Sequence, residues 1–187
     1  MDPSVSLAEP SMIFEETKLK GAYVVNPEPR NDERGFFART WCQKEFEEHR
    51  LNPRLVQCSL SFNLKKGTWR GMHYQESPHE EAKLVRCTMG AVCDVIVDLR
   101  PNSPTFREHL TVMLSAENRK MLYIPERFAH GFITLEDNTE VFYQMSEFYS
   151  ALSARGFRWN DPLFGIQLPL EVAVISQRDR QYPDFRE

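Results

Sequence analysis

The chain has 187 residues, 41% of them hydrophobic and 27% charged, and carries a net charge of −4. This length fits one domain with a sizeable core, and the acidic balance argues against nucleic acid or an anionic membrane as the main partner. No run approaches the ~18 apolar residues that a membrane span needs, and the N-terminus lacks the basic and apolar regions of a signal peptide. We therefore expect a disordered lead-in over residues 1–12 and a single domain over residues 13–187.

The four cysteines form no CxxC pair and lie in apolar or strand-like stretches. Such a pattern is typical of reduced, structural thiols in a cytoplasmic protein. The residues concerned are Cys42, Cys58, Cys87 and Cys93.

Short apolar runs separated by turn residues follow one another along the chain, with one helix, at residues 43–49. Strands are predicted at residues 21–25, 35–41, 56–62, 83–89, 91–99, 110–114, 120–124, 131–135 and 139–145. Because only Gly90 interrupts the apolar stretch 83–99, we interpret that stretch as a central hairpin. Many short strands at a spacing of about 8–12 residues favour an antiparallel sandwich or barrel, so the predicted fold class is all-β.

Polar residues with catalytic chemistry stand out in three segments that should otherwise be core strands: residues 69–75, residues 125–132 and the start of the strand at Lys83. Arg70 and His73 are three positions apart, so they share a face of an extended strand only if a bulge intervenes, and Gly71 can provide one. His130 follows a turn and enters a strand, and Lys83 opens another. Each residue alone is more often structural, but together they can converge in the mouth of a small barrel, where such folds hold ligands.

Several ordered motifs carry a family resemblance from about residue 13 to residue 185. They are Arg-Gly-Met-His at 70–73, Ala-Lys-Leu-Val at 82–85, the run 90–100, Ser-Pro-Thr-Phe at 103–106, Ala-His-Gly-Phe at 129–132 and Trp-Asn-Asp-Pro at 159–162. In this order and spacing the chain resembles the dTDP-4-dehydrorhamnose 3,5-epimerase family. The resemblance implies a cupin-type jelly-roll β-barrel with a few short peripheral helices, working as a homodimer without metal or organic cofactor.

A metal-dependent cupin is an alternative, since such proteins use a His-x-His pair, a Glu and a later His. Here His73 is followed by Tyr74 and Gln75, so the second histidine is missing and only His130 matches the later position. Two imidazoles without a partnered carboxylate are a poor ligand set for Zn²⁺ or Fe²⁺, and we expect no bound metal. A non-catalytic cupin that binds sugar nucleotides is the other alternative.

Epimerisation beside a ketone needs a base on one face, a proton donor on the other and a group that stabilises the enolate oxygen. An imidazole with its ordinary pKa of about 6.5 has a usable neutral fraction at pH 7, and a phenol with a pKa of about 10 keeps its proton. The resemblance assigns these roles to His73 as base, with Asp179 as its carboxylate partner, Tyr143 as proton donor and Lys83 as enolate stabiliser. The substrate contacts that it implies are Arg34, Gln57, Ser59, Arg70, His130, Tyr149 and Arg178.

Two departures from the family pattern fall on binding positions. Arg39 and Ala154 stand where the family usually has glutamates, and losing an acceptor can change recognition. The catalytic set is intact, so the first hypothesis is epimerisation at C3, C5 or both of a dTDP-linked 4-keto-6-deoxyhexose, in deoxysugar or surface-polysaccharide biosynthesis. A mono-epimerase acting on a CDP- or GDP-linked 4-keto sugar is equally compatible with the catalytic residues.

Overall fold

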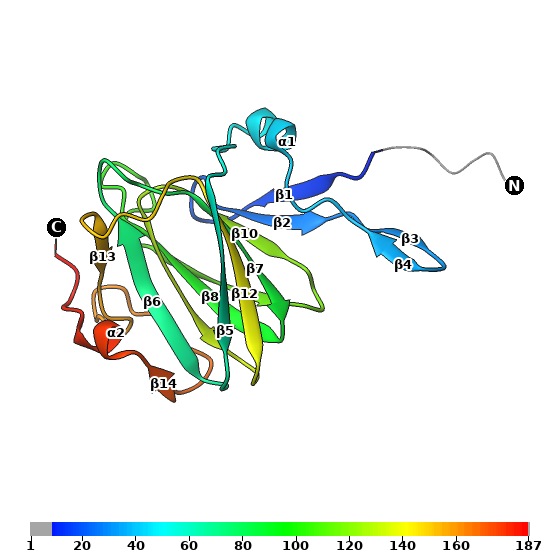
Figure 1. Cartoon of the computed structure of the whole chain (residues 1–187). Helices are drawn as coiled ribbons and strands as arrows, with labels where there is room; N and C mark the ends of the chain where they lie inside the picture. The colour runs from blue at the N-terminus through cyan, green and yellow to red at the C-terminus, as the bar shows by residue number, and fades with distance from the viewer. Residues whose placement is uncertain (1–8, 187) are drawn as a thin grey trace, which may run out of the picture.

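Two antiparallel sheets face each other in the computed structural model, which describes residues 9–186 (Figure 1). The first sheet holds, in spatial order, β1 (Met12–Glu16), β2 (Tyr23–Pro27), β10 (Met121–Ile124), β7 (Lys83–Met89), β12 (Thr139–Met145) and β5 (Gln57–Asn63). The second sheet holds β13 (Ala154–Gly156), β6 (Thr68–Gln75), β11 (Phe128–Thr134), β8 (Ala91–Asp98) and β9 (His109–Ser115), and β14 (Val174–Ile175) runs parallel to β6. The all-β prediction is confirmed.

Two short helices and one hairpin lie outside the sheets. The helices are α1 (Gln43–Glu48), which confirms the predicted helix, and α2 (Gln177–Gln181) beside β6 (Figure 1). The hairpin of β3 (Arg30–Asp32) and β4 (Gly35–Phe37) projects from the body of the barrel. Among residues 9–186, no helix is both long enough and apolar enough to cross a membrane.

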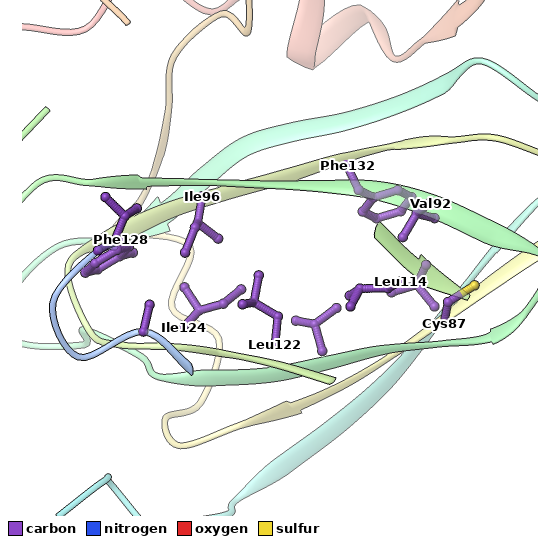
Figure 2. Close-up of a cluster of buried hydrophobic side chains, with 12 residues drawn as sticks. Cys87, Val92, Ile96, Leu114, Leu122, Ile124, Phe128 and Phe132 are labelled. Carbon is purple, nitrogen blue, oxygen red and sulfur yellow. The ribbon is translucent and has the colours of Figure 1, made fainter. Parts of the chain in front are cut away.

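Part of the space between the sheets is filled by a cluster of inward side chains from both, as Figure 2 shows. Val85 and Cys87 of β7 face Val92 and Ile96 of β8, and Phe132 of β11 packs with them. Each of these side chains is at most 3% exposed, and burying one such side chain stabilises the fold by about 1.5–3 kcal/mol. This cluster fixes the distance between the two sheets.

The strand β8 is buried on both faces, which explains its continuous apolar sequence. Its inward residues join the cluster between the sheets, while Cys93, Val95 and Val97 face the other way. There they pack against the C-terminal segment through Phe157 and Phe164. A strand covered on both sides has no solvent face on which to alternate polar residues.

The predicted hairpin over residues 83–99 is wrong, although both of its strands exist. β7 belongs to the first sheet and β8 to the second, so the two do not pair and the chain crosses between the sheets at Gly90. Gly90 has φ +73°, and a Cβ there would lie 2.5 Å from Oγ1 of Thr139. The apolar character that indicated pairing comes from burial between layers.

The N-terminal predictions are partly wrong. The strand expected over residues 35–41 ends at Phe37 and pairs only with β3. Residues 1–8 of the expected lead-in lie outside the described residues, but Met12 begins β1, is buried, and donates its backbone N–H to Glu45 at 2.9 Å. β1 is an edge strand of the first sheet and pairs with β2 alone.

Candidate active site

A cavity of about 700 Å³ lies between the two sheets. Strands β5, β7 and β12 of the first sheet line one side of it, and β6 and β11 of the second sheet, with the segment 174–179, line the other. The sequence-predicted residues found on its wall are His73, Tyr143, Asp179, Lys83, Gln57, Ser59, Arg70, His130, Tyr149 and Arg178. One predicted residue, Arg34, lies elsewhere.

A bulge in β6 brings Arg70 and His73 to the same face, which is the arrangement that Gly71 was expected to permit. His130 of β11 pairs with His73 and Phe132 pairs with Arg70, so two steps along β11 correspond to three along β6. The extra residue shifts the alternation by one, which turns both polar side chains toward the cavity. Gly71 has φ +137°, and a Cβ on it would approach the Cα of Gly131 to 2.4 Å.

The His73 imidazole is held by the carboxylate of Asp179, whose Oδ1 lies 2.7 Å from Nε2. The His73 side chain is 43% exposed and faces the cavity, whereas that of Asp179 is 6% exposed. Asp179 sits in the first turn of α2, where its N–H donates to the N-cap hydroxyl of Ser176. The carboxylate also accepts the N–H of Gly71 at 3.4 Å, so α2 and β6 fix the pair from two sides.

The electrostatics of this pair favour an ionised Asp179. Burial raises the pKa of Asp179, but the hydrogen bond and charge of His73, with the hydrogen bonds of Gly71 and Ser176, outweigh burial, and the net pKa lies below its usual value. A carboxylate that stays ionised orients the imidazole and stabilises the imidazolium that forms when the ring takes a proton. The arrangement suits a general base.

Tyr143 and Lys83 come from the opposite sheet. They lie on β12 and β7, which are neighbouring strands, and both face the cavity. Burial raises the pKa of Tyr143 well above that of a free phenol, and the nearby Asp94 raises it further. The phenol is therefore protonated at neutral pH, on the far side of the cavity from His73.

A second histidine–carboxylate pair lies on the cavity wall, and half of it was missed in the sequence. Nε2 of His130 lies 2.9 Å from Oδ2 of Asp94, which is fully buried on β8. Burial raises the pKa of Asp94, an effect that the charges of His130 and Lys83 oppose. A lone aspartate in the apolar run Ala91–Val97 was the available signal, because a buried carboxylate needs a partner.

The predicted binding residues are also held by neighbours. Nε of Arg70 donates to Asn63 at 2.7 Å, and Nε of Arg178 donates to the Tyr182 hydroxyl at 2.8 Å. Gln57 accepts the backbone N–H of Tyr149 at 3.1 Å, which fixes the loop that carries this exposed aromatic ring. An aromatic face and two guanidinium groups thus border one cavity.

The two arginines near the hairpin lie outside this cavity. Arg34 is on the β3–β4 turn, its side chain is 85% exposed, and it pairs with Asp32. Arg39 is bound to Glu45 at 2.8 Å and Glu9 at 3.4 Å, so its charge is used within the N-terminal segment. Ala154, the other departure from the family pattern, does line the cavity.

Neither a cysteine nor a cluster of three metal-binding side chains is found at the cavity among residues 9–186. Within the described part of the chain, no three His, Cys, Asp or Glu side chains lie where they would hold one metal ion. All four cysteines are free. Burial raises the pKa of Cys87 and of Cys93 to about 11, which makes both thiols unreactive at neutral pH.

Comparison with known proteins gives consistent matches over nearly the whole chain. A family model described as dTDP-4-dehydrorhamnose 3,5-epimerase matches residues 16–187. The dTDP-4-dehydrorhamnose 3,5-epimerase of Shigella flexneri is 43% identical over 164 residues, which cover 87% of this chain and 90% of that protein.

Solved structures agree with the sequence matches. The Bacillus anthracis enzyme of the same name, with TDP and PPi bound, has a TM-score of 0.90 at 38% identity, covering 94% of this chain and 100% of that one. The Legionella pneumophila dTDP-6-deoxy-D-glucose-3,5-epimerase in complex with dTDP-4-keto-L-rhamnose has a TM-score of 0.85 at 33% identity, covering 95% and 100%. The expected cupin-type jelly roll is confirmed.

Proposed function

This chain belongs to the dTDP-4-dehydrorhamnose 3,5-epimerase family, and we propose that it epimerises a nucleotide-linked 4-keto-6-deoxyhexose by direct proton transfer between substrate and side chains. It is an isomerase that acts on a dTDP-linked sugar of this type. The residue roles proposed for it rest on one observation: the His73–Asp179 pair and the protonated Tyr143 face one cavity from opposite sheets.

The first step is removal of a proton from the carbon beside the ketone. Asp179 accepts the N–H at one ring nitrogen of His73, which leaves the other nitrogen with a lone pair for this proton. The electron pair of the broken C–H bond forms a double bond to the carbonyl carbon of the sugar. The electrons of the C=O π bond move onto the carbonyl oxygen, which becomes the negatively charged enolate oxygen. The Lys83 ammonium, which also faces the cavity, stabilises this charge.

The second step returns a proton to the opposite face of the carbon. The Tyr143 hydroxyl supplies it, the enolate electrons form the new C–H bond, and the tyrosine is left as a phenolate. Solvent reprotonates Tyr143 and removes the proton from His73, which resets the site. Stereochemistry inverts because donor and base belong to different sheets.

The nucleotide part of the substrate needs cations for its diphosphate and an aromatic face for its base. Arg70 and Arg178 offer guanidinium forks that match phosphate oxygens, and the exposed ring of Tyr149 offers a stacking surface. Gln57, Ser59 and His130 supply further polar atoms on the same wall. The ligand-bound relatives hold TDP or a dTDP-linked sugar, and we propose that these residues make the corresponding contacts here.

Deuterium incorporation tests the function and the number of carbons involved. Purified protein treated with a chelator is incubated in D₂O with dTDP-, CDP- or GDP-linked 4-keto-6-deoxyhexose. We expect exchange with the dTDP sugar, at two carbons for a 3,5-epimerase and at one for a mono-epimerase. Absence of exchange with all three sugars contradicts the proposal, and exchange that requires added metal contradicts the metal-free mechanism.

We also propose that the chain works as a homodimer. The hairpin that carries Arg34 projects from the body of the two sheets (Figure 1), and Arg34 does not line the cavity of its own chain. A substrate bound in another copy is therefore the proposed target of this residue. Leu60 and Phe62 of β5, at the edge of the first sheet, are 61% and 48% exposed and offer apolar area for association. Light scattering coupled to size exclusion checks this, and a monomeric mass with full activity contradicts it.

A cytoplasmic location is proposed with it, since four free thiols suit a reducing compartment.

A further inference from the structure

Lys83, the proposed enolate stabiliser, is paired with a carboxylate inside the cavity. Its Nζ lies 2.8 Å from Oε1 of Glu81, and each of the two side chains is 12% exposed. Both residues line the cavity. Glu81 has no role in the mechanism proposed above. Removing a carboxylate from water costs free energy, and the ion pair with Lys83 offsets this cost.

The backbone directs both side chains into the cavity. Ala82, between them, is buried on the other side of the sheet in a cluster with Leu84 and Phe46. Since side chains alternate along an extended segment, Glu81 and Lys83 point the opposite way.

The segment is also firmly held. The N–H of Ala82 donates to the Ser146 hydroxyl at 2.8 Å, and the Ala82 carbonyl accepts the Ser146 N–H at 3.0 Å. The backbone that carries Glu81, just before the start of β7, is therefore held in place by these two hydrogen bonds.

A fixed carboxylate changes what a lysine can do. The lysine ammonium is carried on a flexible four-carbon side chain that has many rotamers. Holding the ammonium at one position costs the conformational entropy of the other rotamers. A short charge-assisted hydrogen bond to Glu81 selects a rotamer before substrate arrives and occupies one of three N–H donors, leaving two for the enolate oxygen. Pre-organised donors stabilise developing charge without a cost of reorganisation during the reaction.

We propose that Glu81 is a positioning residue that acts through Lys83, holding its ammonium where the enolate charge develops. The proposal rests on the epimerase function proposed above. Glu81 should therefore affect kcat more than substrate affinity, because the Lys83 ammonium that it positions interacts mainly with the enolate charge of the transition state.

Three variants separate positioning by charge from a packing role. Glu81→Gln keeps the shape and removes the charge, whereas Glu81→Asp keeps the charge and shortens the side chain. We expect kcat about tenfold lower in Glu81→Gln with KM within about twofold, and Glu81→Asp closer to wild type. The matched control is Glu80→Gln, the same change at the next residue, which does not line this cavity and borders a different one behind β6.

Coupling to the lysine provides the deciding measurement. In a Lys83→Met background, Glu81→Gln should change the deuterium exchange rate less than twofold, because its target is gone. A tenfold loss in that background, a Glu81→Gln kcat equal to wild type, or an activity order with Gln above Asp overturns the proposal. Thermal melting of each variant confirms folding before rates are compared. Wild-type protein that exchanges no deuterium at all contradicts the epimerase function itself, a result distinct from these.

Discussion

Replacing Asp179 with asparagine removes the negative charge beside His73 while keeping the size of the side chain. The hydrogen bond that loses its charge assistance joins Oδ1 to Nε2 over 2.7 Å, and the side chain at 179 is 6% exposed, so little solvent can compensate. A hydrogen bond to a charged group contributes about 1.5–3 kcal/mol, and this corresponds to about a 10- to 150-fold decrease in kcat. The loss falls on kcat because the imidazolium exists only after proton removal.

The assay is the initial rate of epimerisation followed by NMR, with kcat and KM determined separately. Asp184→Asn is the matched control, since Asp184 lies on the same C-terminal segment and pairs with the exposed side chain of Arg158, outside the cavity. We expect the control to retain wild-type kcat. A kcat for Asp179→Asn within twofold of wild type, or a loss confined to KM, would refute the assignment of Asp179 as the partner of the base.

Tyr143, Gly71 and the two buried cysteines can each be tested by a separate measurement. The Tyr143→Phe variant should form no epimerised product but should still exchange the substrate proton that His73 removes for deuterium, and NMR distinguishes these two outcomes. Burial raises the pKa of Tyr143, so the phenol stays protonated and the wild-type kcat should not fall because of this residue between about pH 7 and 9. Gly71→Ala should lower the free energy of unfolding by about 2–5 kcal/mol, because φ is +137° and the new Cβ meets a backbone atom at 2.4 Å; an unchanged melting temperature would count against this. Cys87 and Cys93 should resist iodoacetamide at pH 8 in folded protein and react in denaturant, as mass spectrometry reports; rapid labelling of either when folded would contradict their burial.

The sequence predicted the fold class and indicated that Arg70 and His73 could share a face through a bulge at Gly71, because both inferences follow from local rules of alternation and turn chemistry. It did not predict the pairing of strands. The strands on either side of Gly90 are apolar because each is buried in its own sheet, and an apolar run does not state which strand lies beside it. Long-range pairing depends on the whole chain, which local periodicity does not record.

In the site, too, local sequence patterns predicted some residues, while contacts between distant parts of the chain could not be predicted from them. The convergence of His73, Lys83 and His130 could be expected from polar residues that interrupt core strands. Asp179 lies 106 positions from His73, and only the resemblance connected them, since spacing along the chain says nothing about such a contact. Glu81 escaped notice because a glutamate in a charged loop is ordinarily solvated, and its role depends on the direction in which Ala82 turns the backbone.

Arg34 is the one predicted site residue that lies outside the cavity. The family pattern assigned it to substrate binding, whereas the structure has it on an exposed hairpin outside the cavity of its own chain. The cavity of a single chain is therefore lined by every residue proposed for catalysis and every residue proposed for binding except Arg34, and a second copy is the proposed source of this arginine.

The most direct test of the central claim compares deuterium uptake by wild-type protein and the variant His73→Asn, with a dTDP-linked 4-keto-6-deoxyhexose in chelator-treated D₂O. We predict uptake beside the ketone in the wild type and none above the uncatalysed rate in His73→Asn, with both proteins folded by thermal melting. Uptake by His73→Asn at the wild-type rate would contradict the claim that this histidine is the base.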